Sequence, residues 1–352
     1  MTNIHILITG IGGGGVGEQV LKAIKLSKKQ YTVIGTDTTD LCKNKYEVDF
    51  FCVIPRADDP MYMNVLTDLA TKYNVKALIP GSEPELKIIS KNRSVLITRN
   101  VIPFINPESV IDICLDKFKT NSFLEENGFL FPRTVLIKDK GDLNTIDFFP
   151  AVIKPSVGGG GSANTMIAQN SQELELFGQY MLNLYNQFII QEYVGTPEQE
   201  YTVSVLSGIN GEFINSIVIK RDILTGLGSR TKIKNNTDKK SLGPVLAISS
   251  GISQGEVVIN KTVSDYCEKL ALILGAASAI NIQCRLYNNQ VYVFEINPRF
   301  SGTTSMRALV GYNEPDVLIR KEILKEEISP RFSYKLGYVL RGLVETYMED
   351  NK

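Results

Sequence analysis

Short apolar runs alternate with amphipathic segments through the first third of the chain. The runs end in glycine or polar residues and are rich in β-branched side chains, and they cover residues 4–9, 31–36, 50–54, 77–80 and 101–105. Helical periodicity separates most of them. Strands that alternate with helices predict a parallel, doubly wound sheet, because a crossover helix is needed to join parallel strands. We therefore expect a Rossmann-like α/β unit over residues 1–105.

The remainder of the chain has a different pattern, with strand-like runs that follow one another closely. The expected strands cover residues 134–137, 151–154, 188–194, 200–206, 212–220, 279–287 and 290–296. Helices are expected mainly over 106–128, 172–186 and 256–274. This pattern is typical of an α+β unit. The segment 222–244 is polar and contains glycines, which predicts a long loop of the kind that is often functional.

The last two of these runs predict a β-hairpin whose register matters. A three-residue loop over 288–290 would place Gln283 opposite Glu295, on the same face of the hairpin. A two-residue loop would place Gln283 opposite Phe294 instead. We favour the three-residue loop, with an Asn or Gln in the left-handed turn position.

The composition narrows the class of function. A chain of 352 residues predicts two or three domains, and 43% hydrophobic with 22% charged residues is ordinary for a soluble protein. Lys+Arg and Asp+Glu are equal at 38 each, which argues against a general nucleic-acid or membrane surface. The five cysteines lack CxxC spacing and indicate free thiols in a reducing cytoplasm. The one histidine, His5, lies in the first expected strand, which argues against a His-based metal site or triad.

The end of the last expected strand carries candidate chemistry. Glu295 and Asn297 share one face because strand side chains alternate, while Phe294 and Ile296 point to the other face. A carboxylate and an amide offer hard oxygen ligands for Mg²⁺. Arg299 follows with a forked cation suited to phosphate or carboxylate. The pattern indicates a site for nucleotide phosphates, and a strand-end salt-bridge cluster is the structural alternative.

The first glycine run follows the first expected strand and fits G-x-G-x-x-G. Together with Asp37 at the end of the second strand, Gly12, Gly14 and Gly17 form a dinucleotide fingerprint by pattern alone. Two other interpretations remain open. The glycines could serve only a tight strand–helix turn, or they could form an anion or substrate site at the helix N-terminus.

The second glycine run, Gly158–Gly161, follows the expected strand that contains Lys154. Four consecutive glycines lose much chain entropy when they are ordered. A mobile flap that closes over a polyphosphate could use that freedom, with backbone N–H groups as ligands and Lys154 as a point charge. A flexible hairpin tip is the structural alternative.

Taken together, these residues resemble the ATP-grasp superfamily, including the synthetase domain of the carbamoyl-phosphate synthetase large subunit and small ATP-dependent amino-acid ligases. The motifs occur in family order across about residues 106–310. They are Asp116-Lys117, Lys154-Pro-Ser with Gly158–Gly161, Gln191–Val194, Glu200-Tyr201, Asn281–Gln283 and Glu295–Gly302. The chain has one ATP module and no room for a second, so synthesis of carbamoyl phosphate is not expected.

The resemblance implies a role for each matching position. Adenine would meet the backbone of the 192–194 segment, ribose would meet Glu200, and the phosphates would meet the lysines and the flap. The implied ATP contacts are Lys117, Lys154, Gly158, Gly159, Gly160, Gly161, Glu192, Tyr193, Val194 and Glu200. The implied Mg²⁺ ligands, with Mn²⁺ as a substitute, are Gln283, Glu295 and Asn297. Arg299 and Lys154 are the implied catalytic residues.

The resemblance also implies the organisation and the reaction. It divides the chain into a pre-ATP-grasp domain over 1–105, a small lobe with the flap over 106–190, and a large lobe with the Mg²⁺ and ATP site over 191–352. The implied enzyme is a cytoplasmic carbon–nitrogen ligase that joins a small carboxylate to an amine through an acyl phosphate, releasing ADP and phosphate. A homodimer is implied as well.

The substrate residues are less well defined by the sequence. Candidates are Gly14 and Glu83 in the first domain, Arg221 and Arg230 at or within the polar segment 222–244, and Arg299. These cations could hold a carboxylate.

Two other functions stay open at this point. One is an NAD-linked oxidoreductase or epimerase built on the first glycine run, although it leaves Lys154 and Glu295 without a role. The other is an inactive nucleotide-binding regulatory protein.

Overall fold

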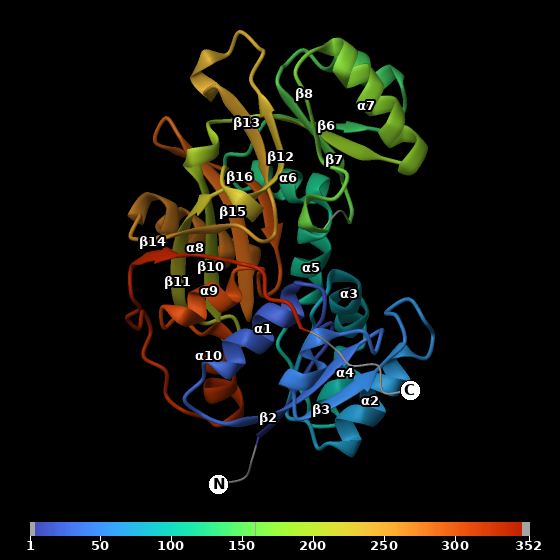
Figure 1. Cartoon of the computed structure of the whole chain (residues 1–352), viewed down its shortest axis with the longest axis vertical. Coiled ribbons are helices and arrows are strands. Elements are labelled where there is room, and N and C mark those ends of the chain that lie inside the picture. The colour runs from blue at the N-terminus through green and yellow to red at the C-terminus, as the bar shows by residue number, and fades with distance from the viewer. Residues whose placement is uncertain (1–3, 159, 347–352) are drawn as a thin grey trace.

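The computed structural model describes residues 4–158 and 160–346 of the chain. Its N-terminal part is a five-stranded parallel sheet in the order β3-β2-β1-β4-β5 (Figure 1). The strands are β1 (Ile4–Ile8), β2 (Tyr31–Asp37), β3 (Phe50–Val53), β4 (Ala77–Ile79) and β5 (Ile102–Pro103). The doubly wound sheet expected from the sequence is confirmed.

Helices cover both faces of this sheet, which explains why its central strands β1 and β4 are mostly apolar. Ile6 and Ile8 pack into one core cluster, whereas Leu7 between them packs into another on the opposite face. The helices of this part are α1 (Val16–Lys25), α2 (Tyr62–Lys72), α3 (Glu83–Lys91) and α4 (Arg93–Ile97).

The strand order reverses between β1 and β4. In open parallel sheets such a reversal leaves a crevice outside the carboxyl ends of the two strands, where ligands commonly bind. The first glycine run follows β1, and the turn Gly81-Ser82 leads from β4 into α3. Both segments therefore lie at this crevice.

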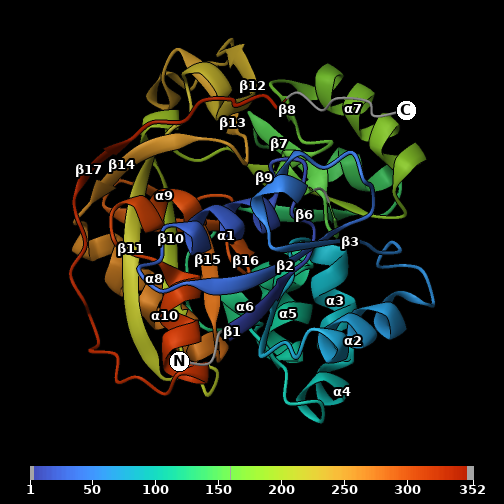
Figure 2. The ribbon, with the colours of Figure 1, turned by 60° about the horizontal axis from the view of Figure 1, so that its bottom comes forward.

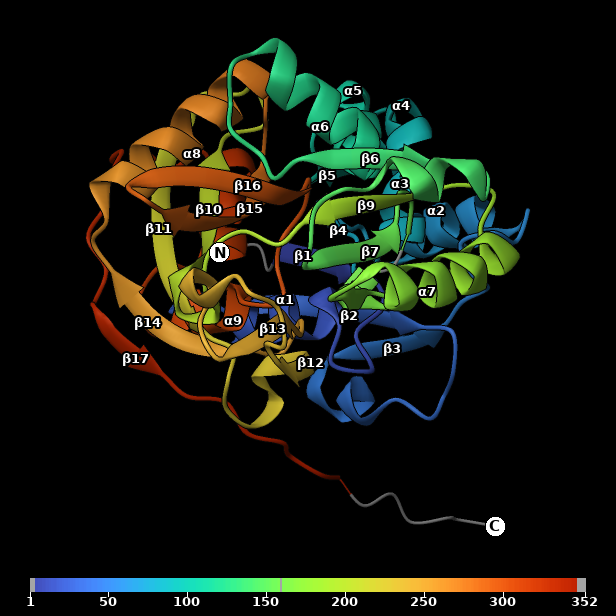
Figure 3. The same cartoon turned by 90° about the horizontal axis from the view of Figure 1, so that it is seen from above.

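A four-stranded antiparallel sheet in the order β6-β9-β7-β8 forms a separate small layer, with α7 (Ser171–Leu184) on its outer face (Figure 3). Leu174 and Met181 of α7 are buried against Ile153 and Ile190 of the sheet. The strands are β6 (Thr134–Ile137), β7 (Ala151–Pro155), β8 (Met166–Ala168) and β9 (Phe188–Glu192). The helices α5 (Glu108–Cys114) and α6 (Lys117–Glu126) precede this sheet in the chain.

A six-stranded antiparallel sheet in the order β16-β15-β10-β11-β14-β17 forms the larger layer. Val203 and Val205 of β10 face α8, while Leu206 belongs to the cluster that contains residues of α1 and α9. The strands are β10 (Glu200–Ser207), β11 (Phe213–Asp222), β14 (Gln254–Val258), β15 (Ala279–Tyr287), β16 (Gln290–Asn297) and β17 (Gly337–Val339).

The helices α8 (Lys261–Leu274), α9 (Thr304–Leu309) and α10 (Glu314–Leu318) complete this layer. Helix α1 lies against α9 and α10, between the N-terminal sheet and the larger sheet (Figure 2). Ile8 of the first sheet and Ile217 of the second belong to one buried cluster, so the two parts share a core.

The segment 222–244 is not a long loop, contrary to expectation. Strand β12 (Ser229–Lys234) pairs with β13 (Val245–Ser249) in a two-stranded antiparallel sheet. Thr231 and Ile233 face inward, whereas Arg230, Lys232 and Lys234 are exposed. This alternation is a half-buried strand pattern, but charged residues on the outward face made the segment look like a loop.

The hairpin of β15 and β16 has a two-residue loop rather than the expected three. Asn288 and Asn289 both have positive φ, 50° and 60°, as the tight turn that suits a twisted hairpin requires. The pairing of Gln283 with Glu295 is nevertheless present, because a β-bulge shifts the register between Gln283 and Cys284. The expected partner was right, and the expected loop was wrong.

Two further features bear on sequence expectations. All five cysteines carry free thiols. Across the described ranges, no helix combines the length and apolar character that crossing a bilayer requires.

Candidate active site

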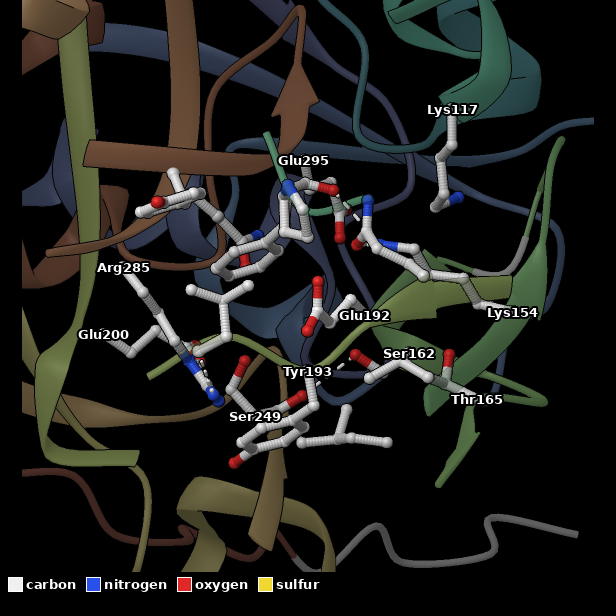
Figure 4. A pocket seen from close by; sticks show the side chains of 18 of the residues that line it. Lys117, Lys154, Ser162, Thr165, Glu192, Tyr193, Glu200, Ser249, Arg285 and Glu295 are labelled. Atoms are coloured by element: carbon white, nitrogen blue, oxygen red, sulfur yellow. Dashed lines mark hydrogen bonds and ion pairs between the residues drawn. The ribbon is translucent and has the colours of Figure 1, made fainter. Parts of the chain in front are cut away.

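A pocket with about 710 Å³ of empty space lies between the small sheet and the larger sheet, with β13 forming part of its wall. Figure 4 shows Lys117, Lys154 and Glu295 toward one end, and Arg285 with Glu200 toward the other. Its lining residues come from β7, β9, β10, β13, β15, β16 and the start of α6. Segments from widely separated parts of the chain therefore meet here.

Lys154 projects from β7 and is only 6% exposed. Its Nζ donates to Gln191 Oε1 at 2.9 Å and to the Phe294 carbonyl at 3.1 Å. Burial lowers the pKa of the Lys154 ammonium to about 8, although the nearby Glu295 carboxylate opposes this shift. The ammonium is thus a desolvated cation whose charge a phosphate would stabilise.

Lys117 is held beside the second glycine run by the start of α6. Asp116 caps this helix by accepting from the Phe118 N–H, and it also accepts from the Ser156 hydroxyl at 2.7 Å. Lys117 Nζ donates to the Gly158 carbonyl at 3.0 Å. The helix start and the glycine run therefore form one connected edge of the pocket.

The second glycine run extends from this edge toward β13. Gly158 has φ +78°, a conformation that favours glycine, and a short 3₁₀ turn covers Gly160–Ser162. The Ser162 hydroxyl donates to the Ser249 carbonyl at 2.9 Å (Figure 4). Gly159 lies outside the described residues. Ser162, which follows the run directly, therefore links it to β13 across the pocket.

The three predicted metal ligands lie along the β15–β16 hairpin. Gln283 lies opposite Glu295, and Asn297 lies two residues further along the strand on the same face. Burial would raise the pKa of the Glu295 carboxyl, but the charges of Lys117 and Lys154 outweigh it and hold the pKa below its usual value. Glu295 therefore carries a negative charge deep in the pocket.

This oxygen set fits a hard divalent cation. One ionised carboxylate and two amide oxygens are ligands of the kind that Mg²⁺ takes when phosphates supply the rest. The described residues contain no cluster of three His, Cys, Asp or Glu side chains, so a purely protein-bound metal cage is absent from that part of the chain.

Glu200 lies at the floor of the pocket, held by two arginines. Its Oε1 accepts from Arg221 Nη1 at 3.0 Å, and its Oε2 accepts from Arg285 Nη2 at 3.1 Å. Arg221 Nη1 also donates to Gln283 Oε1 at 3.1 Å, which orients that predicted metal ligand. Burial lowers the pKa of the Arg221 guanidinium, with Glu200 opposing the shift.

Arg285 was not predicted from the sequence. It follows Gln283 by two strand positions, so it shares the face of the predicted ligands. This strand periodicity is the feature of the sequence that could have identified Arg285 as a pocket residue. It also donates to the Val194 carbonyl at 3.0 Å and stacks 4.4 Å from the centre of the Tyr193 ring.

The segment 192–194 forms the opposite end of the pocket. The Tyr193 hydroxyl accepts from the Ala247 N–H at 2.9 Å, which fixes this segment to β13. Val152, Ile248 and Phe294 contribute apolar surface to the same pocket. The result is a partly apolar slot beside the end of β9, which suits a flat heterocycle.

A second pocket, with about 470 Å³ of empty space, adjoins the first. The two share a wall formed by Ser162, Ser249, Gln283 and Glu295. The second pocket is lined otherwise by small polar residues and two cations, namely Thr202, Arg221, Ser250, Gly251, Asn281, Arg299, Ser301, Gly302 and Thr303. This lining suits a small, polar anion.

Arg299 reaches the second pocket from the loop after β16. Its Nη2 donates to Asn297 Oδ1 and to Glu83 Oε1, both at 2.9 Å, and its Nη1 donates to the Phe300 carbonyl. Its buried Nε has no hydrogen-bond partner among the described residues. Glu83 belongs to α3, so the N-terminal part of the chain contacts a lining residue of this pocket.

The first glycine run has different surroundings. The Gly12 N–H donates to Asp37 Oδ2 at 2.8 Å, and the Gly14 N–H donates to Glu18 Oε2 at 2.9 Å. Carboxylates of the chain itself occupy the amides that would receive a pyrophosphate. Gly17 has a packing role, since a Cβ there would lie 2.3 Å from the Gly10 carbonyl oxygen. This arrangement argues against the dinucleotide interpretation.

Two cations predicted near the polar segment have different positions. Arg221 is buried in β11 and lines the second pocket. Arg230 is exposed on β12 and is not among the residues that line the two pockets described here.

The fold and the pocket define a nucleotide site between a small sheet and a larger sheet, preceded by a Rossmann-like unit. Residues 114–303 match the ATP-grasp domain, and residues 6–104 match the N-terminal domain described as PylC-like. The chain belongs to the ATP-grasp family.

Relatives by sequence include the carbamoyl phosphate synthase large chain of Thermoplasma volcanium, 24% identical over 316 residues. That match covers 80% of this chain and 27% of the relative, so the chain spans about a quarter of that protein's length. The tetrahydromethanopterin:alpha-L-glutamate ligase of Methanocaldococcus jannaschii is 34% identical over 105 residues, which cover 28% of this chain and 36% of the ligase.

A solved structure with the same fold is the L-amino acid ligase from Bacillus licheniformis. The TM-score is 0.66 with 17% identity, and the match covers 93% of this chain and 78% of that one. At this identity the likeness is one of fold.

Proposed function

We propose that this protein is an ATP-dependent carboxylate–amine ligase. The observation that carries the proposal is the shared wall between the two pockets. On one side lie Lys117, which contacts the second glycine run, and Lys154; on the other lie Arg221 and Arg299, with Glu295 in the shared wall. A nucleotide phosphate and a substrate carboxylate would therefore meet across the predicted metal ligands, as phosphoryl transfer requires.

In this proposal ATP occupies the first pocket. Adenine lies in the slot beside Glu192, Tyr193 and Val194, and the triphosphate extends toward the lysines at the other end. Lys117, Lys154 and the glycines of the run 158–161 hold the phosphates. Glu200 would contact the ribose. Its carboxylate is held in position by ion pairs with two arginines.

Gln283, Glu295 and Asn297 would hold Mg²⁺. When bound, the ion would supply Lewis-acid stabilisation of charge on the phosphate oxygens. Side chains of the protein would stabilise the remaining negative charge. Lys154 would offset the charge of the phosphates, and Arg299 would offset the charge that develops on the transferred phosphoryl group.

The second pocket holds the carboxylate substrate. Attack of its oxygen on the γ-phosphorus yields an acyl phosphate and ADP. The amine nitrogen then bonds to the acyl carbon as the carbon–oxygen bond to the phosphate breaks, and the phosphate leaves with the electron pair. The ammonium form of the amine loses two protons in all, one to phosphate and one to solvent. The glycine run would exclude water from this intermediate.

We assign the domains accordingly. Residues 1–105 form the pre-ATP-grasp domain, followed by the small lobe and then the large lobe. Strand β9 ends at Glu192, two residues past the limit expected at 190, so the small lobe is better ended there. Two of the relatives are named as amino-acid or glutamate ligases, which supports amino acids as the first substrates to test.

Thermal melting followed by product analysis tests the proposal. Mg-ATP should raise Tm by mass action, whereas NAD should not. Phosphate release should then depend on an amino acid, or a pair of them, drawn from a panel tested singly and in pairs. A rise in Tm with NAD, without any change in Tm with Mg-ATP, would contradict the proposal.

A further inference from the structure

Glu83 has an unusual position for a residue of the N-terminal domain. It begins α3 directly after the turn that follows β4, at the crevice where the strand order reverses. Its Oε1 forms an ion pair with Arg299 Nη2 at 2.9 Å, across 216 positions of the chain. The two side chains are 24% and 15% exposed, so the pair is partly shielded from water.

The other oxygen of this carboxylate points toward the second glycine run. A Cβ built on Gly160 would lie 4.0 Å from Glu83 Oε2. No hydrogen bond from a described residue reaches this oxygen. Among the described residues, Glu83 therefore offers one carboxylate oxygen without a hydrogen-bond partner, between Arg299 and the second glycine run.

The charges around the pockets make this oxygen significant. Lys117, Lys154, Arg221 and Arg299 are all cationic, and an amine arrives from water as an ammonium ion. Like charges at such short range repel strongly where water is scarce. A carboxylate beside Arg299 would offset this repulsion and stabilise the ammonium form of an arriving amine.

The other carboxylates of the site already have partners. Glu200 accepts from two arginines, and Glu295 lies in the field of both lysines among the predicted metal ligands. Glu192 pairs with Lys239 at the far end of the first pocket. Glu83 contacts the second pocket through Arg299, and its Oε2 has no hydrogen-bond partner among the described residues.

Resting on the proposed ligase function, we propose that Glu83 binds the ammonium group of the amine substrate and so selects amines that arrive charged. The amine would lie between the second pocket and the glycine run, with Arg299 beside it. This placement gives the N-terminal domain a direct part in choosing the nucleophile.

The test compares charged and neutral nucleophiles. Glu83→Gln keeps the shape of the side chain and removes its charge, and Glu83→Asp keeps the charge. The charged nucleophile is the amino acid of the panel that supports the fastest amide formation. The neutral one is hydroxylamine, which is largely uncharged near neutral pH and traps the acyl phosphate as a hydroxamate.

For Glu83→Gln we expect the KM for the amino acid to rise about 10- to 100-fold, as loss of a hydrogen bond to a charged group predicts. The ratio of amide to hydroxamate formed should fall about as much, and Glu83→Asp should recover part of it. Glu326→Gln is the matched control, because Glu326 pairs with Lys29 across another contact of the N-terminal domain.

The outcomes separate this inference from the proposed function. If the unaltered protein forms neither amide nor hydroxamate, the proposed function fails. If it forms both and Glu83→Gln leaves the amide-to-hydroxamate ratio unchanged, the role of Glu83 is overturned. It is also overturned if Glu83→Gln and Glu326→Gln lower Tm and both activities equally, since Glu83 would then only tie the domains together.

Discussion

The two glycine-rich runs of this chain make an informative comparison. Each follows a β-strand, and each contains glycines with positive φ, such as Gly13 at +70° and Gly158 at +78°. On sequence grounds either could bind phosphate. In the structure, amides of the first run donate to carboxylates, whereas the Gly158 carbonyl of the second run accepts from Lys117.

This difference shows that backbone freedom alone does not make a phosphate site. The amides of Gly12 and Gly14 donate to Asp37 and Glu18, which repel a phosphate as well as occupying its donors. Near the second run, Lys117 and the buried Lys154 supply positive charge that the chain leaves uncompensated by a close carboxylate pair. The side chains around a glycine run decide its ligand.

Replacement of Lys154 should have the largest effect on this contrast. In Lys154→Met we expect kcat/KM for Mg-ATP to fall by roughly 10²–10³, the usual cost of removing one donor that stabilises transition-state charge. The matched change Lys43→Met removes a lysine 3.5 Å from Glu18, beside the first run, and should leave turnover near that of the unaltered protein. Equal losses in both variants would contradict the contrast.

Lys154 also gives the account a pH signature. Because burial lowers its pKa to about 8, its charge is present below that pH and is lost above it, so affinity for Mg-ATP should fall as pH rises through about 8. Between about 8 and 10.5 the unfolded chain holds a proton that the folded chain lacks. The free energy of unfolding should therefore gain a rising component there, absent in Lys154→Met.

Arg299→Ala should separate nucleotide binding from phosphoryl transfer. Arg299 lines the second pocket and not the first, so nucleotide binding should persist while turnover falls by roughly 10²–10³. The Mg-ATP shift in Tm and the rate of phosphate release report these two properties. Full amide formation by the variant would refute a role in transfer.

A matched pair of glycine substitutions sharpens the comparison further. A Cβ on Gly13 or on Gly158 would meet no atom within 4 Å, so alanine at either position costs only backbone strain of about 1–2 kcal/mol. Stability should fall alike in Gly13→Ala and Gly158→Ala. The KM for ATP should rise only in Gly158→Ala, by about three- to tenfold. A rise in Gly13→Ala instead would reverse the assignment of the runs.

The smallest effect is expected at the rim of the nucleotide pocket. Lys239 and Glu192 form an ion pair at 3.0 Å, with side chains 43% and 31% exposed. Exposed pairs of this kind contribute at most about 1 kcal/mol. Lys239→Ala should therefore change the KM for ATP less than about fivefold, and a larger change would mean that the lysine touches the nucleotide.

Local pattern predicted much of this molecule. The apolar runs of the N-terminal sheet could be read directly, because strands buried on both faces have few polar positions. Glu295, Asn297 and Arg299 lie close together in the sequence, so their clustering at one strand end followed from strand periodicity. Lys154 could be placed on a strand for the same reason.

Features that depend on distant partners could not be predicted. The bulge after Gln283 restores a register that the two-residue turn alone would have lost, and nothing local marks it. Strand β12 has alternating exposure that its charged residues disguise. The carboxylate of Asp37 accepts from the Gly12 N–H only because the fold brings the end of β2 beside the first run. The sequence alone presents both glycine runs as equals for this reason.

The most direct measurement of the central claim is a crystal structure with Mg²⁺ and a non-hydrolysable ATP analogue. We expect the β- and γ-phosphates beside Lys117, Lys154 and the second glycine run, with the ion at Glu295. Phosphates seated on the amides of Gly12–Gly15, with Lys154 and Glu295 uninvolved, would contradict the account.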